Sequence, residues 1–225
     1  MKNERDHRDT YRARFILAAV FFALFILDLV LVLSGKTEAF DAAAGSAVMS
    51  LRNAVRTPIY LTVTQMGSWK VIVSIGALIL LANFFRWKKK DVPIAVAACF
   101  LDLGLYSAIK PVVQRIRPPR EFWLLIEHGF SFPSGHTMNS MFCYGMMIYL
   151  IIRNSHSRPL TIVMTGVLSL LIVFIGFSRI FCGVHYVTDM LGGACLGFSM
   201  LMLATVAIDE IMLRRFPEGD APRLS

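Results

Sequence analysis

Three short stretches of the chain combine residue types that bind phosphate and transfer phosphoryl groups. The stretches are Lys110 followed by Arg117-Pro118, then Pro133-Ser134-Gly135-His136, then Ser178-Arg179 followed by His185 and Asp189. Guanidinium and ammonium groups hold phosphate oxygens, and an imidazole acts as a nucleophile or as a general acid. Together the three stretches predict a single phosphate-handling site.

The second stretch lies immediately before an apolar run that reads as a helix. Ser134 is a good helix N-cap, and the free N–H groups of a helix start attract anions. Gly135 would let the backbone approach a phosphate closely. The alternative for this stretch alone is a plain helix cap without a ligand.

The third stretch places His185 and Asp189 four residues apart, on one face of a helix start. A carboxylate bonded to one imidazole nitrogen fixes the tautomer, which leaves the other nitrogen free to attack. Arg179 lies six residues upstream and is expected to reach the same anion. The alternative is a structural His–Asp pair that caps a helix.

The first stretch supplies Lys110 and Arg117, a point charge and a bidentate donor. Anchoring to lipid headgroups would explain this pair equally well if it stood alone. Each alternative accounts for one stretch, and none accounts for all three in one chain. We therefore interpret the three stretches jointly as one site.

Six apolar segments would position these residues. The chain has 225 residues, of which 56% are hydrophobic, and its mean hydropathy is +0.61, above the level of soluble domains. A membrane-spanning helix needs about 17–25 residues. We predict a single all-α domain over residues 1–225, a bundle of six transmembrane helices. The predicted spans are residues 15–33, 69–86, 92–110, 136–152, 160–177 and 187–209.

The net charge of +8 indicates membrane topology and gives no reason to expect a nucleic acid. Basic residues collect on the cytoplasmic side of membrane proteins. They precede the first span and follow the second, fourth and sixth, as Lys2, Arg5, Arg8, Arg12, Arg14, Arg86, Lys88, Lys89, Lys90, Arg153, Arg158, Arg214 and Arg215. Both termini, including the 14 N-terminal residues, are therefore expected in the cytoplasm. The three phosphate-handling stretches then face outward.

Four weaker features carry structural expectations. Residues 41–55 have helical spacing and predict a short interfacial helix in the first outer loop. Asp28 and Asp102 lie inside spans, where we expect them to bond neighbouring helices or, for Asp102, Lys110. The small residues at 193–197 predict close helix packing within the chain. The four cysteines match no metal or disulfide pattern and are expected in apolar packing.

The three stretches resemble the signature of the type 2 phosphatidic acid phosphatase superfamily, integral-membrane lipid phosphatases, without departure at any signature position. Length and layout are similar to small bacterial members that act on phosphatidylglycerol phosphate and undecaprenyl pyrophosphate. The resemblance implies that His185 forms a phosphohistidine, that Asp189 orients it, and that His136 protonates the leaving oxygen and later activates water. The phosphate would be held by Lys110, Arg117, Ser134, Gly135 and Arg179. Neither a metal nor a cofactor is implied.

The expected activity is hydrolysis of a lipid phosphomonoester or pyrophosphate at the outer face of a bacterial plasma membrane. The partners are then a membrane lipid and the bilayer; the oligomeric state is open, and a monomer is compatible with the sequence. A phosphotransferase would use the same residues, so the sequence does not separate it from a hydrolase. A phosphate-binding transporter is disfavoured, because no Lys or Arg lies in the middle of a span.

Overall fold

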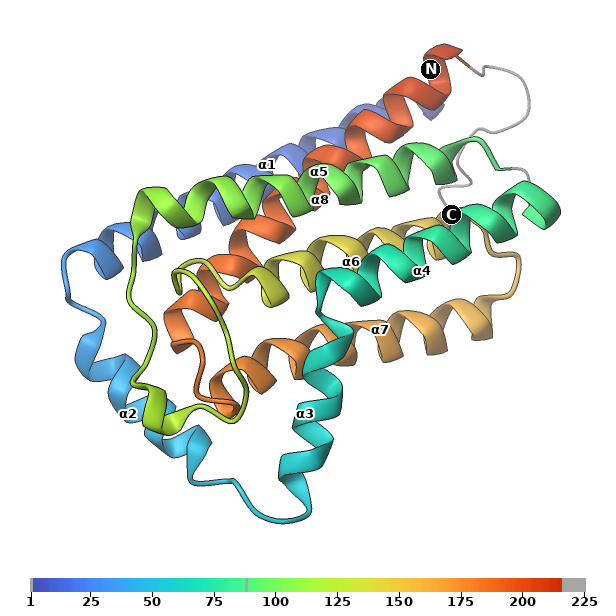
Figure 1. Ribbon diagram of the computed structural model, residues 1–225. Helices are drawn as coiled ribbons and strands as arrows, with labels where there is room; N and C mark the ends of the chain where they lie inside the picture. Colours follow the sequence, from blue (N-terminus) through green and yellow to red (C-terminus); the bar gives the residue numbers. More distant parts are fainter. Residues whose placement is uncertain (1, 88, 216–225) are drawn as a thin grey trace.

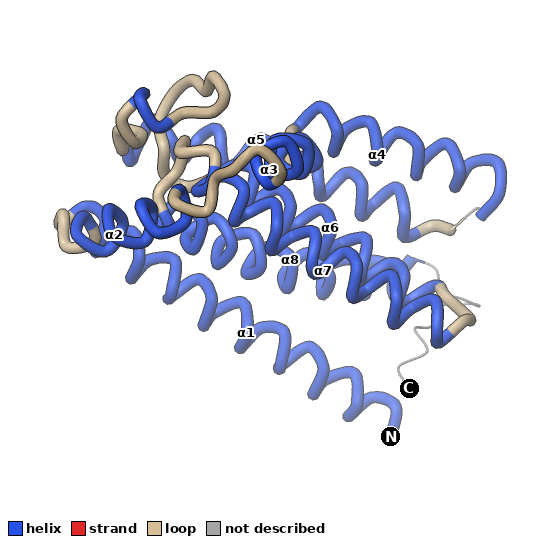
Figure 2. Tube along the Cα trace, turned by 90° about the horizontal axis from the view of Figure 1, so that it is seen from below, coloured by secondary structure: helices blue, strands red, loops and turns tan. Residues whose placement is uncertain are grey.

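The computed structural model describes residues 2–87 and 89–215, with side chains described from residue 8 and omitted for 86 and 87. Among these residues every regular element is a helix (Figure 2), as predicted. The helices are α1 (Lys2–Leu33), α2 (Glu38–Met49), α3 (Arg56–Met66), α4 (Trp69–Ala82), η1 (Asn83–Trp87), α5 (Asp91–Val113), η2 (Arg120–Phe122), α6 (Gly135–Asn154), α7 (Arg158–Phe181) and α8 (Val187–Arg215).

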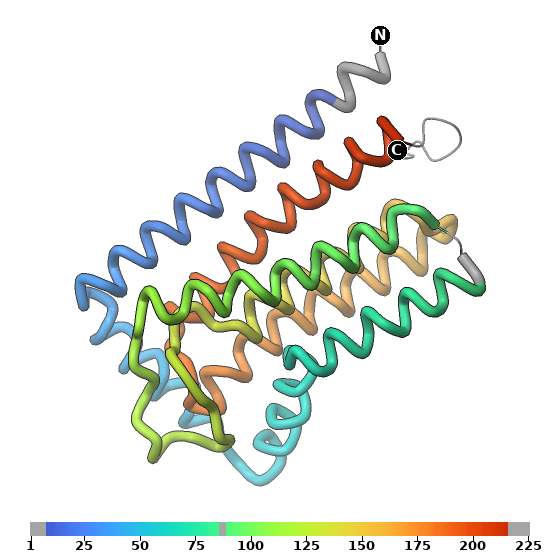
Figure 3. The backbone as a smooth tube through the Cα atoms, turned by 45° about the horizontal axis from the view of Figure 1, so that its top comes forward, coloured from blue at the N-terminus to red at the C-terminus, as the bar shows by residue number. Residues whose placement is uncertain are grey.

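The six long helices α1, α4, α5, α6, α7 and α8 run side by side (Figure 1). One end of the bundle carries α2, α3 and the segments that join α5 to α6 and α7 to α8. The opposite end carries the described start of α1, the end of α8 and the α6–α7 connection (Figure 3). Helix α8 packs mainly along α1 and α6, so the two ends of the chain are joined in one bundle.

All six predicted spans are found as helices, with boundaries that differ by a few residues except at the start of α1. Four of them, α1, α5, α7 and α8, are long and apolar enough to cross a membrane. The bent pair of α3 and the α4 region would add a fifth crossing, with an angle of 55° at the break. Only 11% of the most apolar window of α1 is buried, so its apolar side chains face outward, as in a lipid-facing helix.

Helix α6 is not among the four, and its position explains why. It packs against α8, α7 and α5, and protein covers most of its first half, including the polar residues Thr137, Asn139 and Ser140. A helix enclosed by other helices needs less apolar surface than one that faces lipid. Hydropathy along the sequence therefore does not reveal that α6 is enclosed by other helices.

The first connection differs from the predicted outer loop. Instead of one helix over 41–55, the chain forms α2 at Glu38–Met49 and continues in turns to residue 55. It then forms α3, which we did not predict. Five of its eleven residues are polar, so no apolar run marks it in the sequence.

The end of the bundle opposite α2 and α3 holds an ionic network. Arg14 of α1 and Arg153 of α6 both contact Asp209 of α8, and Arg153 Nε also lies 3.0 Å from Asp91 of α5. This network joins four helices at the end where most predicted cytoplasmic basic residues lie. Lys88, one of those residues, lies outside the described part of the chain.

Glycines bring α8 against α6. A Cβ on Gly193 would lie 2.7 Å from the Ser134 carbonyl oxygen, and one on Gly197 would lie 2.7 Å from that of Met138. The expected packing within the chain is therefore confirmed. The expected bonds of the span carboxylates are not found, because both Asp102 oxygens and one Asp28 oxygen lack hydrogen-bond partners within the described residues. Asp102 lies in the middle of α5 and is fully buried.

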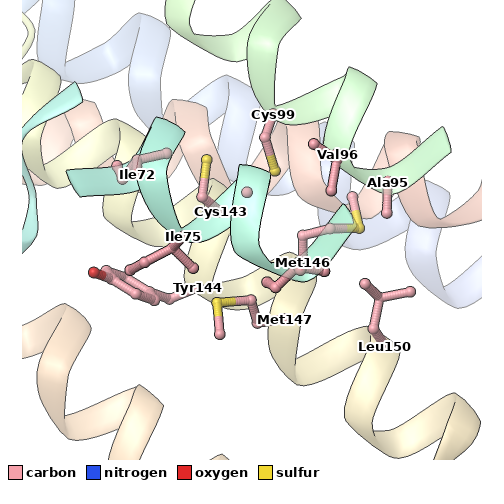
Figure 4. A pocket seen from close by; sticks show the side chains of 12 residues that line it. Ile72, Ile75, Ala95, Val96, Cys99, Cys143, Tyr144, Met146, Met147 and Leu150 are labelled. Carbon is pink, nitrogen blue, oxygen red and sulfur yellow. The ribbon is translucent and has the colours of Figure 1, made fainter. Parts of the chain in front are cut away.

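A cavity of about 40 Å³ lies between α4, α5 and α6 (Figure 4). Its lining includes Cys99, Cys143, Met146 and Met147, in line with the apolar packing role predicted for these two cysteines. The four cysteines are free. The cavity borders one of the hydrophobic clusters of the bundle, and none of the residues with predicted chemistry lines it.

Candidate active site

The predicted site residues gather at the end of the bundle that carries α2 and α3 (Figure 1). Each comes from a helix end or from a segment beside it. Lys110 lies in the last turn of α5, Arg117 follows α5, Ser134 is the N-cap of α6, Gly135 and His136 begin α6, Arg179 lies in the last turn of α7, His185 precedes α8, and Asp189 lies in its first turn. The fold thus brings together residues up to 79 positions apart, from Lys110 to Asp189.

His185 is buried, with 3% of its surface exposed, and both ring nitrogens have contacts. Nδ1 lies 3.2 Å from Asp189 Oδ2, and Nε2 lies 3.0 Å from Arg117 Nη1. Because a guanidinium only donates hydrogen bonds, Nε2 must accept, and the ring proton sits on Nδ1. Burial, and then the positive charges around the ring, hold the pKa of His185 well below its usual range. His185 is therefore neutral, with a lone pair on Nε2.

Asp189 is fully buried and surrounded by donors. Its Oδ2 accepts bonds from the Ser131 hydroxyl and from the Tyr186 N–H, besides its contact with the His185 ring. Its Oδ1 accepts a 2.6 Å bond from Arg115 Nη1. The carboxylate is thus fixed from both sides and in turn fixes the imidazole.

The three predicted phosphate-binding cations contact one short segment, residues 127–130. Lys110 Nζ donates to the Phe130 carbonyl at 2.8 Å, and Arg117 donates to the carbonyls of Gly129 and His128 at 3.0 and 3.1 Å. Arg179 Nη2 contacts the Glu127 carboxylate. Cations fixed in advance by backbone carbonyls need little reorganisation when an anion arrives.

Glu127 lies between the two arginines. Besides its contact with Arg179, its Oε2 lies 3.8 Å from Arg117 Nη2. Arg179 is only 1% exposed; its Nη1 donates to Thr64 at 2.7 Å, and its Nε has no partner within the described residues. The carboxylate of Glu127 therefore occupies the position of an anion beside two guanidinium groups.

The start of α6 differs in detail from the sequence interpretation. Ser134 is at the N-cap but its side chain makes no capping bond; its hydroxyl accepts a 3.0 Å bond from Thr137. Its backbone N–H donates to the Asp189 carbonyl at 2.9 Å, which ties the second stretch to the third. Gly135 is required by packing, since a Cβ there would lie 2.9 Å from the Tyr106 ring.

His136 is half-buried beside this helix start. Its ring makes no hydrogen bond to any residue in the described part of the chain, and it lies near enough to Arg179, Lys110 and Arg117 for their positive charges to act on it. The structure thus places His136 at the site without a direct bond to the other predicted residues. Its ring is available to a ligand.

The turn between α7 and α8 positions His185. Gly183 adopts φ +74°, and a Cβ there would lie 2.2 Å from the Phe122 carbonyl oxygen, so only glycine fits. Arg52, from the turns after α2, donates to the carbonyls of Phe181 and Phe122 at 2.7 to 2.9 Å and so closes the end of α7. Segments from three parts of the chain thus hold this turn.

Sequence reasoning missed five residues of the site, namely Asp41, Thr64, Arg115, Glu127 and Ser131. Arg115 was visible only as one of several basic residues in its loop. Thr64 belongs to α3, which we did not predict. A lone Glu or Ser in a loop gives no signal of its own. In the described ranges, 2–87 and 89–215, no cluster of three or more His, Cys, Asp or Glu residues could hold a metal ion.

Comparison with known proteins identifies the family. The model of the PAP2 superfamily matches residues 91–212, which contain all three stretches. The chain belongs to the PAP2 superfamily. Phosphatidylglycerophosphatase B of Bacillus subtilis is 30% identical to this PAP2 protein over 202 residues, covering 86% of this chain and 96% of the relative. A lipid A 4'-phosphatase of Bacteroides thetaiotaomicron is 33% identical over 136 residues, covering 53% and 55%.

A solved structure has the same fold. The crystal structure of a transmembrane PAP2-type phosphatidylglycerolphosphate phosphatase from Bacillus subtilis superposes on this PAP2 protein with a TM-score of 0.79 and 25% identity. It covers 86% of this chain and 96% of the relative. The predicted family resemblance is confirmed, and with it the expectation of a membrane phosphatase of lipid metabolism.

Proposed function

We propose that this PAP2 phosphatase hydrolyses a lipid phosphomonoester or pyrophosphate through a phosphohistidine on His185. The contact that supports this most directly is the pair of bonds to the His185 ring, which leaves a lone pair on Nε2 beside Arg117. The candidate substrates are phosphatidylglycerol phosphate, undecaprenyl pyrophosphate and phosphatidic acid. Phosphatidylglycerol phosphate is our first choice because the relative that covers most of the chain is named for it.

The proposed reaction has two steps. In the first, His185 Nε2 attacks phosphorus, the bond from phosphorus to the lipid oxygen breaks, and His136 gives that oxygen a proton. In the second, His136 takes a proton from water, the water oxygen attacks phosphorus, and the P–N bond breaks to release inorganic phosphate. Lys110, Arg117 and Arg179, with Ser134 and the Gly135 N–H, hold the phosphoryl oxygens in both steps.

We further propose that six helices cross a bacterial plasma membrane, with both ends of the chain in the cytoplasm and the site outside. The site lies at one end of the bundle (Figure 1), and the basic residues of the α6–α7 connection and of the last turn of α8 lie at the other. This separation agrees with the positive-inside trend. The lipid would then enter sideways from the outer leaflet, with its phosphate at the cations.

Trapping of the phosphoenzyme tests the mechanism. With ³²P-labelled lipid and a denaturing quench at alkaline pH, label should remain on the wild-type protein and on His136→Ala, and be absent from His185→Ala. His136→Ala should slow turnover of a lipid substrate by about 10²–10⁴-fold. The matched control is His128→Ala, since that exposed residue offers only its carbonyl to Arg117. Label kept in His185→Ala and lost in His136→Ala would reverse the two roles.

Release of inorganic phosphate tests the alternative function. A phosphotransferase would use the same residues but pass the phosphoryl group from His185 to an alcohol instead of water. We expect one inorganic phosphate for each lipid consumed, with or without an added alcohol acceptor. Phosphate release that appears only as a minor product beside a phosphorylated acceptor would favour the transferase.

A further inference from the structure

Arg115 lies between two buried carboxylates that come from distant parts of the chain. Its Nη1 donates to Asp189 Oδ1 at 2.6 Å, and its Nη2 donates to Asp41 Oδ2 at 2.7 Å. The side chains of Asp189 and Asp41 are 0% and 1% exposed. The guanidinium also lies 4.3 Å from the centre of the Tyr186 ring. One side chain thus connects α2 to the first turn of α8.

Arg115 stands on the opposite side of His185 from the phosphate-binding cations. Arg117 contacts Nε2 of the imidazole, whereas Arg115 contacts the carboxylate that holds Nδ1. Among the residues that the structure describes, its side chain donates only to Asp189, Asp41 and the hydroxyls of Thr188 and Thr37. Its charge therefore acts on Asp189 and has no direct contact with the place where phosphate would bind.

Asp41 secures this arrangement from α2. Its Oδ1 accepts a 3.0 Å bond from the Thr188 N–H, one of the free amides at the start of α8, and its Oδ2 accepts a 2.7 Å bond from the Thr188 hydroxyl. A residue of α2 thus caps α8 directly before Asp189. The position of α2 and the orientation of Asp189 are linked by these bonds.

A cavity of about 660 Å³ borders the same residues. Its lining includes Asp41, Arg115, His185 and Tyr186, between α2 and the segment after α5. Removal of the guanidinium would have two consequences. Water from this cavity would replace the Arg115 bond to Asp189, and the buried carboxylates of Asp189 and Asp41 would lose their shared positive partner. Either change would loosen the carboxylate that orients the imidazole.

We propose that Arg115, held by Asp41, is a positioning residue that keeps Asp189 aligned with His185. Because Asp41 belongs to α2, the turnover rate then depends on the position of α2. The inference rests on the proposed function, in which Asp189 orients the nucleophile. Partners that orient metal ligands typically change activity by about 10–100-fold when removed, and we take the same range for a partner that orients a catalytic carboxylate. Arg115→Gln should lower kcat by about that factor, with KM for the lipid and inhibition by orthovanadate unchanged. Arg115→Lys should recover part of the lost kcat.

The experiment is a double-mutant cycle with Arg115→Gln, Asp189→Asn and the double variant, assayed with phosphatidylglycerol phosphate in detergent. Because Arg115 acts through Asp189, the double variant should be no slower than Asp189→Asn alone. The control is Arg120→Gln, an exposed arginine of the same segment that only overlies Trp123; its kcat should be that of the wild type. Asp41→Asn should give a smaller loss of kcat that also disappears in the Asp189→Asn background.

Several outcomes of the same experiment would contradict the proposed role of Arg115. Losses that multiply in the double variant, a normal kcat for Arg115→Gln, or a parallel loss of orthovanadate affinity would each overturn the proposal. If Arg115→Gln does not fold, Arg115→Lys takes its place in the same cycle with the same criteria. Normal turnover of Asp189→Asn would instead refute the proposed function, which separates the two failures.

Discussion

Nη1 of Arg117 lies 3.0 Å from Nε2 of His185. The guanidinium that is proposed to bind the phosphate thus contacts the nitrogen that is proposed to attack the phosphorus. The bond holds the imidazole in the tautomer with its proton on Nδ1, facing Asp189. In the proposed reaction Arg117 must give up Nε2 when the phosphate arrives and take a phosphate oxygen instead. The Arg117 contact therefore keeps the proposed nucleophile in the reactive tautomer.

Glu127 is expected to compete with the phosphate. Its carboxylate contacts Arg179 and lies 3.8 Å from Arg117, so an incoming anion must displace it. Glu127→Gln should strengthen inhibition by orthovanadate and by inorganic phosphate by up to about fivefold, because a partly exposed ion pair contributes at most about 1 kcal/mol. Inhibition constants measured beside those of Glu121→Gln, an exposed acid nearby, test this. Weaker inhibition in Glu127→Gln would mean that Glu127 organises the arginines for the anion.

Activity should not depend on a metal ion. In the proposed mechanism Lys110, Arg117 and Arg179 neutralise the phosphate, which is the part that magnesium plays in many phosphoryl-transfer enzymes. Turnover should survive excess EDTA, and orthovanadate should inhibit by binding at the same cations. Loss of activity on chelation, with recovery on adding magnesium, would refute the cation-based mechanism.

The neutral state of His185 predicts a pH effect on stability. Its pKa is lowered in the folded protein and returns to about 6.5 on unfolding. Below pH 6.5 the unfolded chain therefore takes up a proton that the folded protein refuses, so stability falls as the pH falls. The midpoint of thermal unfolding in detergent should drop less between pH 7 and pH 5 in His185→Asn than in the wild type. Exposed His156 gives the control, as His156→Asn should keep the wild-type slope.

Thiol labelling tests the proposed topology. A cysteine at Glu121, in the segment between α5 and α6, should react with an impermeant reagent on intact cells. One at His156, between α6 and α7, should react only after the membrane is opened. Both positions are exposed in the structure. Labelling of His156→Cys alone on intact cells would place the site in the cytoplasm.

The sequence predicted the long helices and the gathering of the three stretches because both depend on strong local signals. Apolar runs of membrane length mark helices whatever their partners. The residue types of Lys110, Arg117, His185 and Asp189 serve one chemistry at recognisable spacings. Helix α6 was found, yet its enclosure by other helices follows from packing, which no window along the chain measures.

The residues that support the site could not be predicted from the sequence. Asp41 and Thr64 come from the connection before α4, and each acts on a residue more than 100 positions away. Ser134 is the N-cap of α6 as predicted, but its hydroxyl accepts a bond from Thr137 and makes no capping bond. Besides its proposed role in phosphate approach, Gly135 leaves room for Tyr106, whose ring would lie 2.9 Å from a Cβ at this position. Such contacts arise only when distant elements meet.

The contacts of residues 127–130 with all three cations limit how this part of the chain can be rebuilt. The segment offers two carbonyls to Arg117, one carbonyl to Lys110 and the Glu127 carboxylate to Arg179. The spacing between these acceptors must stay as it is for all the contacts to form. An insertion within these four residues would separate acceptors from donors, whereas the side chain of Ile126, directly before them, is exposed. A loop graft between relatives should therefore carry everything from Lys110 to Ser134 as one piece.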